Sequence, residues 1–387
     1  MCRGTVRPGP AFHGPPDAPR LPFGIGVGEW IERTGKGRPR REQALPACPE
    51  RFVMSSITAI LVGYLEDPAV TAGAIESLAS QSRPPDEIVL VDNSDDGRHR
   101  PTAERVGAVY VETDRNLGFA QGVNAGAAEA SGDYLLLMNP DSVADGKALE
   151  TLVGALDREP EAAIAGAQIL LPDGRVNAGR NPIHLSGLSW SGGYLGPPQA
   201  GPTEPVLSVS GATMLVRSNA FRKLGGFHPA IFMYHEDVDL CWRARLAGYR
   251  VLFCPDATVT HDYVFDGGRL KWQWLEEGRL IALLTNFESR TLLLLAPLLL
   301  ATELATVGAS LAGGWFPGKL RAWLTVWKKR RLIRAWRSRV TGLRELPDSE
   351  LLPEFSAVVD TPALDGPLIR LAAAPQKAWA GLVRLLA

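Results

Sequence analysis

The stretch DYLLLMNPDS, residues 133–142, decides the fold class predicted for this chain. Its five apolar residues form an uninterrupted run, which predicts a strand buried on both faces. The run ends at Asn139-Pro140-Asp141, so an amide and a carboxylate stand two residues apart at the end of that strand. Open α/β sheets bind ligands at this end, and a divalent cation that bridges phosphates needs hard oxygen ligands. A helix N-cap at Asp141 is the weaker interpretation, because the motif does not stand alone.

Apolar strands alternate with amphipathic helical stretches on both sides of this motif, from Ile57 to His261. This alternation predicts an α/β domain with a mostly parallel sheet. Strands are expected at residues 57–63, 87–91, 106–112, 134–138 and 208–217, and helices at residues 69–81 and from Glu236 onward. Residues 180–205, rich in Gly, Pro and Ser, predict a long loop, which is either functional or disordered.

Carboxylates gather at two further places. Asp92 follows the second expected strand, where ligand binding and the ordinary turn chemistry of DNSDDG are equally good interpretations. Glu236, Asp237 and Asp239 begin a later helix, and the helix dipole together with an Asp239–Arg243 pair accounts for part of that pattern. Three clustered carboxylates after an aromatic loop are also typical of a general base, because neighbouring negative charge raises a carboxylate's pKa.

Composition excludes several classes of protein. With 387 residues, of which 45% are hydrophobic and 21% charged, the chain is mostly folded and long enough for two or three domains. The 41 basic and 42 acidic residues nearly cancel, so no overall field favours a nucleic acid as partner. Four cysteines lie far apart without a CxxC pair, which disfavours a disulfide framework or a zinc site and suits a reducing cytosol.

Residues 1–53 differ in character from the rest, with nine Pro, eight Gly and no apolar run that could form a signal-peptide core. We interpret them as a disordered leader. An apolar strand begins soon after Met54, which leads to the hypothesis that Met54 is the natural start and that the leader is an upstream extension of the reading frame.

Five motifs follow one another in the order and spacing of a known family. They are VDNSDDG (91–97), NLGFAQGVNAG (116–126), MNPDS (138–142), SGATMLVR (210–217) and GGFHPAIFMYHEDVDLCWRARLAGY (225–249). Over residues 55–290 the chain resembles the family 2 inverting glycosyltransferases of the GT-A fold, in particular their bacterial rhamnosyltransferase-like branch. The resemblance implies a Rossmann-like catalytic domain over residues 54–290.

The resemblance implies that several matching positions bind the nucleotide sugar. Asp92 would hydrogen-bond the nucleobase, and Asn116, Gly118 and Asn139 would contribute to the same binding site. Asn139 replaces the first Asp of the family's DxD-type metal motif, which weakens the expected dependence on metal. The loop at 180–205 is expected near the acceptor.

The resemblance also implies metal-binding and catalytic residues. Asp141, with His261, would hold Mg²⁺ or Mn²⁺, although a surface histidine at a strand end is an equal interpretation of His261. Asp237 would be the catalytic base, with Glu236 beside it. These roles describe transfer without a covalent enzyme intermediate.

Two departures from the family pattern affect the expected phosphate-binding residues and the expected mode of synthesis. DYVFDGGR follows His261 in place of the serine or basic residue that often engages the phosphates, which leaves Arg269 and Lys271 as substitutes. No QxxRW motif appears downstream, so addition of a single sugar is expected rather than processive synthesis.

The last quarter of the chain combines apolar and basic stretches. Residues 291–302 carry no charge, and residues 319–339 carry nine Lys or Arg and no acid, interleaved with Trp323, Trp327 and Trp336. Such composition predicts a helical, membrane-associating region over residues 291–345, followed by a tail over 346–387. A core helix packed on the catalytic domain and a solvated basic face are the alternatives, and a spanning segment near 291–316 stays open.

Together these features predict an enzyme that transfers a sugar from a nucleoside-diphosphate sugar, either dTDP-rhamnose or a UDP-sugar, to a lipid-linked or cell-surface polysaccharide acceptor. The expected location is the inner face of the plasma membrane. A catalytically inactive scaffold of the same fold is one alternative. A nucleotidyltransferase is the other, but the first strand runs into GYLEDPAV and not into a glycine-rich basic loop.

Overall fold

The computed structural model of this chain describes residues 55–262, 269–360, 378–381 and 383–384. The expected leader at 1–53 lies outside the described residues, and so does Met54. The same holds for residues 263–268, which follow His261, and for residues 361–377 of the expected tail.

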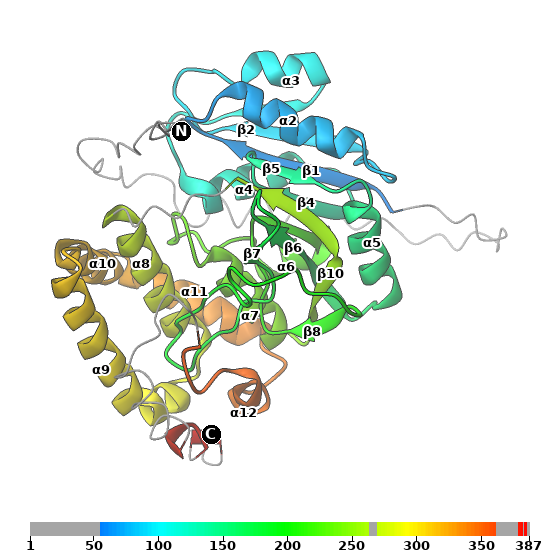
Figure 1. Cartoon of the computed structure of the whole chain (residues 1–387). Coiled ribbons are helices and arrows are strands. Elements are labelled where there is room, and N and C mark those ends of the chain that lie inside the picture. Colours follow the sequence, from blue (N-terminus) through cyan, green and yellow to red (C-terminus); the bar gives the residue numbers. More distant parts are fainter. Residues whose placement is uncertain (1–54, 263–268, 361–377, 382, 385–387) are drawn as a thin grey trace, which may run out of the picture. The chain divides into compact units, whose positions relative to one another are not determined.

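A mixed β-sheet forms the centre of the described chain (Figure 1). Its main path has the strand order β3-β2-β1-β4-β9-β6-β10-β5, with β7 paired to β6 and β8 paired to β10. The strands are β1 (Ile57–Gly63), β2 (Glu87–Asp92), β3 (Val109–Glu112), β4 (Tyr134–Met138), β5 (Ser142–Ala144), β6 (Ala162–Leu170), β7 (Val176–Ala178), β8 (Glu204–Val206), β9 (Thr213–Arg217) and β10 (Arg250–His261).

Most of the long strands run in one direction. β1 pairs in parallel with β2 and β4, β2 with β3, and β6 with β10, whereas β9 runs antiparallel between β4 and β6. The α/β fold with a mostly parallel sheet is therefore confirmed. As a consequence, the ends of β2, β4 and β10 and the beginning of β9 lie along one edge of the sheet.

The two faces of the sheet are covered by different helices. Ala59 and Leu61 of β1 belong to the core beneath α2 and α5, whereas Ile60 and Val62 belong to the core beneath α4, α6 and α7. This alternation follows from the two-residue period of a strand. The helices are α2 (Pro68–Ala79), α3 (Arg100–Val106), α4 (Gly118–Glu129), α5 (Ala148–Arg158), α6 (Ser218–Leu224) and α7 (Glu236–Leu246).

Two of the expected strands differ from the structure. The strand expected at 106–112 begins only at Val109, because Val106 ends α3 and Gly107 caps that helix with a φ of 68°. The strand expected at 208–217 begins only at Thr213. Gly211 and Ala212 bond to α7 and to the loop after β4, and Val209 forms an isolated bridge with Arg180, so these residues do not extend β9.

The carboxyl-terminal region is helical, as expected. It contains α8 (Arg269–Asn286), α9 (Ser289–Ala312), α10 (Phe316–Lys328), α11 (Arg330–Leu343), α12 (Asp348–Leu351) and a short 3-10 turn η1 (Leu352–Glu354). An apolar core joins Trp242 of α7, Phe287 after α8, Leu295 of α9 and Trp336 of α11. The helices therefore pack on the catalytic part of the chain.

Part of the basic stretch at 319–339 is buried in the protein, so these residues do not contribute to the membrane-associating surface predicted for residues 291–345. Lys319 is fully buried and pairs with Glu276 of α8. Lys329 donates a hydrogen bond of 2.7 Å to the carbonyl oxygen of Ala230. The alternative interpretation, a helix packed on the catalytic domain, holds for these residues.

Candidate active site

Asn139, Asp141 and His261 meet at the edge of the sheet. β5 pairs antiparallel with the end of β10, and this register sets Ser142 opposite His261. Nε2 of His261 lies 2.9 Å from Oδ1 of Asp141 and 3.4 Å from Nδ2 of Asn139. The interpretation of His261 as a surface histidine is therefore wrong, because it ends a strand but is only 5% exposed.

These three side chains fit a divalent cation that is shared with a substrate. Within residues 55–262 and the other described segments, no cluster of three or more His, Cys, Asp or Glu residues could hold a metal alone. Mg²⁺ commonly takes one or two carboxylates and fills its other positions with phosphate oxygens and water. The Asp141 side chain is 38% exposed, so its carboxylate is open to such a ligand.

Asp237 is tied to the same edge by the SGAT motif. Its Oδ2 accepts a hydrogen bond of 2.8 Å from the backbone amide of Gly211, and its Oδ1 accepts one of 2.7 Å from Val238. The neighbouring carbonyl of Ala212 accepts a bond of 2.9 Å from the amide of Asn139. Two adjacent residues therefore connect Asp237 to the loop that carries Asp141.

Glu236 lies beside Asp237 in an environment that favours its neutral form. It is 6% exposed, and its Oε2 atom has no hydrogen-bond partner among the residues that the structure describes. Burial, reinforced by the charge of Asp237, raises the pKa of Glu236 well above its ordinary value. Burial also raises the pKa of Asp237, against the opposing effect of the amides of Gly211 and Val238.

Asp239 does not join this pair, which corrects the prediction of three clustered carboxylates. It is fully buried and pairs with Arg243 at 2.8 Å, as the i,i+4 spacing predicted. Nδ2 of Asn286 in α8 donates a further bond of 3.0 Å to Oδ1 of Asp239. Asp239 therefore links α7 to α8, and its carboxylate is not available as a base.

The loop before Asp237 is strained and closely packed. Tyr234 and His235 have φ values of 66° and 72°, which side-chain-bearing residues rarely adopt and which cost about 1–3 kcal/mol each. Nε2 of His235 lies 3.0 Å from the carbonyl oxygen of Gly187, within the long loop. A Cβ atom on Gly278 of α8 would lie 2.5 Å from Cβ of His235, so only glycine permits this approach. Residues 180–205 thus reach the loop that carries Asp237.

Lys271 lies near the same loop. Its Nζ atom is 5.4 Å from the ring centroid of Tyr234, and burial lowers its pKa to about 8. Arg269, the other expected phosphate-binding side chain, begins α8, but its side chain lies outside the described residues. Lys271 is therefore a cationic side chain beside the loop that leads to Asp237.

Asp92 is buried at the end of β2, and its carboxylate already accepts four hydrogen bonds. Its Oδ1 accepts bonds from the amide and the hydroxyl of Ser94, and its Oδ2 accepts bonds from the amide of His99 and the hydroxyl of Tyr110. A nucleobase could bind this carboxylate only by displacing a donor such as Tyr110. The expected contact with the base therefore stays a prediction.

Asn93, which the sequence analysis did not single out, holds two of the predicted site residues in place. Its Nδ2 donates to the carbonyl of Gly118 at 3.1 Å and to Oδ1 of Asn116 at 3.3 Å, so it fixes the loop before α4. Gly118 has a φ of 77°, and a Cβ atom there would lie 2.2 Å from the carbonyl oxygen of Phe232. The helix start at Gly118 thus contacts the loop that leads to Asp237. The DN pair at the end of β2 was the available signal for Asn93.

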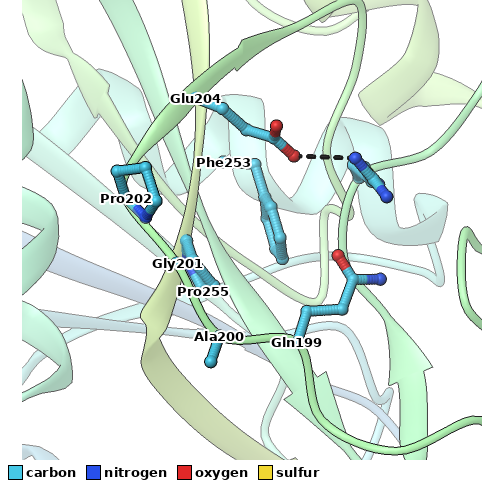
Figure 2. Close-up of a pocket in the computed structure, with 8 residues that line it drawn as sticks. Gln199, Ala200, Gly201, Pro202, Glu204, Phe253 and Pro255 are labelled. Carbon is cyan, nitrogen blue, oxygen red and sulfur yellow. Dashed lines mark hydrogen bonds and ion pairs between the residues drawn. The ribbon is translucent and has the colours of Figure 1, made fainter.

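A separate cavity of about 340 Å³ lies where the long loop crosses β8 and β10 (Figure 2). Glu204 and Phe253 line it, together with Gln199 and Pro255, and Glu204 pairs with Arg180 at 2.9 Å. It contains none of the sequence-predicted site residues. We therefore do not assign the donor site to it.

The mixed, mostly parallel sheet with acidic groups along one edge is the arrangement expected of the GT-A fold. Residues 58–225 match the model of glycosyl transferase family 2. An N-acetylglucosaminyl-diphospho-decaprenol L-rhamnosyltransferase of Mycobacterium tuberculosis is 31% identical over 222 residues, which cover 50% of this chain and 72% of the relative. The chain belongs to glycosyl transferase family 2, in which it is rhamnosyltransferase-like.

A second relative and a solved structure are also similar to this chain. The O-antigen chain rhamnosyltransferase WbaN of Salmonella anatum is 23% identical over 228 residues, which cover 54% of this chain and 67% of the relative. The crystal structure of GalNAc-T7 with UDP, GalNAc and Mn²⁺ matches with a TM-score of 0.51 at 16% identity, over 62% of this chain and 49% of that one. This chain thus spans about half the length of GalNAc-T7, and the likeness supports the GT-A fold.

Proposed function

We propose that this enzyme transfers one sugar, with inversion, from a nucleoside-diphosphate sugar to a hydroxyl group of a lipid-linked or cell-surface polysaccharide acceptor. Its similarity to a rhamnosyltransferase named for a diphospho-decaprenol substrate supports a rhamnosyl donor and a lipid-linked acceptor. dTDP-rhamnose is the favoured donor, and a UDP-sugar is the second candidate.

The connection between Asp141 and Asp237 is the observation that carries this proposal. The amide of Asn139 donates to Ala212, and the amide of Gly211 donates to Asp237, so two adjacent residues link the loop that carries Asp141 to Asp237. Inverting transfer needs the leaving group stabilised on one side of the sugar and the nucleophile activated on the other. Two acidic groups held at a fixed distance and orientation could perform these two tasks.

Asp237 acts as the general base in the proposed reaction. As the acceptor oxygen attacks the anomeric carbon, the bond to the diphosphate breaks and the hydroxyl proton passes to Asp237. The amides of Gly211 and Val238 hold its carboxylate in place, and burial raises its pKa, which favours uptake of the proton. General-base catalysis of this kind contributes about 10² to 10⁴ in rate.

Asp141 and His261 would hold Mg²⁺ or Mn²⁺ in this proposal, with Asn139 beside them in the nucleotide-sugar site. When bound, the cation would offset the negative charge on the departing diphosphate. Asp141 and His261 already lie 2.9 Å apart, so their positions need little rearrangement. Lys271, beside Tyr234, is the candidate side chain for the same phosphate groups.

We propose that the enzyme works at the inner face of the plasma membrane, where a lipid-linked acceptor would be reached. Among the described helices, α9 has the length and the apolar composition that could cross a membrane. The near-neutral overall charge supports the expectation that no nucleic acid is a partner.

A donor panel tests the proposed function. The full chain is incubated with dTDP-rhamnose and with UDP- and GDP-sugars, with and without Mn²⁺, and release of the nucleoside diphosphate is measured. We expect one donor to be consumed, faster with Mn²⁺ and with an acceptor. No consumption of any donor would favour an inactive scaffold, whereas pyrophosphate release from a nucleoside triphosphate and a sugar 1-phosphate would favour a nucleotidyltransferase.

A further inference from the structure

The exposed side of helix α9 is apolar, whereas the exposed side of a helix that faces water is usually polar. Its outward side carries four leucines, each at least 60% exposed: Leu293, Leu300, Leu304 and Leu311. Their spacing of 7, 4 and 7 residues puts them on one stripe of the helix. The remaining exposed residues between them are alanines, Pro297 and Gly308, so this stripe, which we call the leucine face, carries no charge.

The side of α9 that faces the protein is polar in its second half. Thr302 and Ser310 are buried, and Glu303 points to α8 and α10. The hydroxyl of Thr306 accepts a hydrogen bond of 2.8 Å from Lys319. In its first half α9 buries Leu295 and Leu298 in the core, whereas its second half buries polar residues and exposes leucines. An exposed leucine stripe opposite a buried polar side fits an apolar environment outside the protein.

A buried ionic network fixes α9 in this orientation. Arg279 of α8 pairs with Glu303 and, at 2.8 Å, with Glu276. Lys319 of α10 pairs with Glu276 and, at 2.9 Å, with Glu303. Nε1 of Trp323 donates a further bond of 3.0 Å to Glu303. Two carboxylates and two cations are thus balanced in a water-poor site.

Exposed cations accompany a second apolar stripe on α10. Leu320, Leu324 and Trp327 are exposed at i, i+4 and i+7. Exposed basic residues lie on α10 and α11, with no carboxylate paired to them in the described part of the chain: Arg321, Lys328, Arg331 and Arg334. Between Glu303 and Glu345 the sequence contains no acidic residue. This surface is therefore complementary to an anionic one, whereas a second copy would present the same cations and repel it.

We propose that α9 and α10 dock on an anionic lipid leaflet, with α9 lying in the plane of the membrane and its leucine face among the acyl chains. This inference deepens the proposed membrane location and rests on it for its biological meaning. The leucine face from Leu293 to Leu311 is about 27 Å long, and exposed Trp327 suits the level of the head groups. In Figure 1, α9 lies at the edge of the described chain away from the sheet.

The ionic network argues for an in-plane helix over a spanning one. If α9 crossed the bilayer, Glu303 would leave Arg279 and Lys319 or would draw their charges into the hydrocarbon. Separating a buried ion pair and placing charge in hydrocarbon are both strongly unfavourable. An in-plane α9 keeps every pair of the network and removes only the leucine face from water.

Vesicle binding tests the docking surface. The full chain is sedimented with phosphatidylcholine vesicles, with and without phosphatidylglycerol. Leu300→Glu combined with Leu304→Glu should lower binding about tenfold or more, because charge replaces buried apolar area. Val70→Glu, at an exposed position of α2, is the matched control and should bind like the parent. Arg321→Gln combined with Arg331→Gln should weaken binding only when phosphatidylglycerol is present.

Cysteine labelling tests the orientation. Ser289→Cys and Ala312→Cys mark the two ends of α9 and are treated with a membrane-impermeant maleimide in inverted membrane vesicles and in intact spheroplasts. The in-plane helix predicts that both ends react in inverted vesicles and neither in spheroplasts, relative to the parent chain. Reaction of one end in each preparation would overturn the in-plane orientation.

Two other outcomes would overturn the docking surface itself. One is undiminished vesicle binding by the double leucine variant. The other is a lipid-free dimer of the parent that this variant abolishes, because the leucine face would then pair two copies. Hydrolysis of a soluble nucleotide sugar should be the same in parent and leucine variant, so failure of the proposed chemistry is distinguishable from failure of the docking.

Discussion

The backbone amide of Gly211 lies 2.8 Å from Oδ2 of Asp237, and a Cβ atom built on Gly211 would lie 3.0 Å from Cβ of Asp237. A residue of the SGAT motif thus contacts the proposed base so closely that a side chain there would displace Asp237. Because Ala212 bonds the loop that carries Asp141, the same turn also relates the base to the proposed metal site.

Gly211→Ala should lower sugar transfer about tenfold to a hundredfold, because a small displacement of the base is costly to the rate. The fold should survive, since the added methyl group meets the Asp237 side chain and no backbone atom at closer range. Gly73→Ala in α2, where an added Cβ meets nothing within 4 Å, is the matched control for rate and melting temperature. Equal transfer rates of the two variants would show that Gly211 does not position Asp237.

Asp141→Ala should abolish donor turnover, and His261→Ala should raise the Mn²⁺ concentration needed for half-maximal rate. Both follow from the 2.9 Å contact that brings the two side chains to one site. The measurement is a Mn²⁺ titration of turnover, with Asp173→Asn in an exposed turn as control. Full activity of Asp141→Ala in EDTA would mean that side chains alone stabilise the leaving group.

Glu236→Gln should stabilise the protein increasingly as the pH rises. The pKa of Glu236 is raised above its ordinary value of 4.5 in the folded state, so ionisation destabilises the fold at higher pH. The glutamine variant lacks this ionisation. Its melting temperature should therefore exceed that of the parent by more at pH 8 than at pH 5. A difference independent of pH would contradict the raised pKa of the buried Glu236 carboxyl group.

Asp92→Asn should destabilise the fold by about 1–3 kcal/mol, because an amide group would face donors that now bond a carboxylate. The amides of Ser94 and His99 are two of the four donors. Chemical denaturation measures this change. If Asp92→Asn were as stable as the parent but bound the nucleotide sugar more weakly, Asp92 would serve to bind the nucleobase and not to stabilise the fold.

Local pattern in the sequence predicted the individual elements well. β1 and β4 have the bounds expected from their apolar runs, and Asp237 lies in the first turn of α7, where the acidic cluster predicted a helix start. Helix α3 was missed because its residues, RPTAERV, have a short and mostly polar pattern. Such a segment is determined by its neighbours more than by its own periodicity.

Contacts between distant residues were not predictable from local pattern. Asn139 and His261 are 122 positions apart, and only the register of β5 against β10 brings them together. In the same way, the basic stretch in the sequence suggests that Lys319 is a surface cation, but Lys319 is buried and pairs with Glu276 and Glu303 from two other helices. The resemblance to a family supplied the proposed roles of the site residues, whereas the apolar outer side of α9 could be recognised only from the packing of the structure.

The most direct test of the proposed mechanism is the rate of sugar transfer by Asp237→Asn, measured beside the binding of the nucleotide donor. The substitution preserves the size of the side chain and removes its basic oxygen, while Asn139, Asp141 and His261 are unchanged. We predict that transfer falls by about 10² to 10⁴ with donor affinity nearly unaltered. Transfer at the parent rate by Asp237→Asn would contradict the assignment of Asp237 as the base.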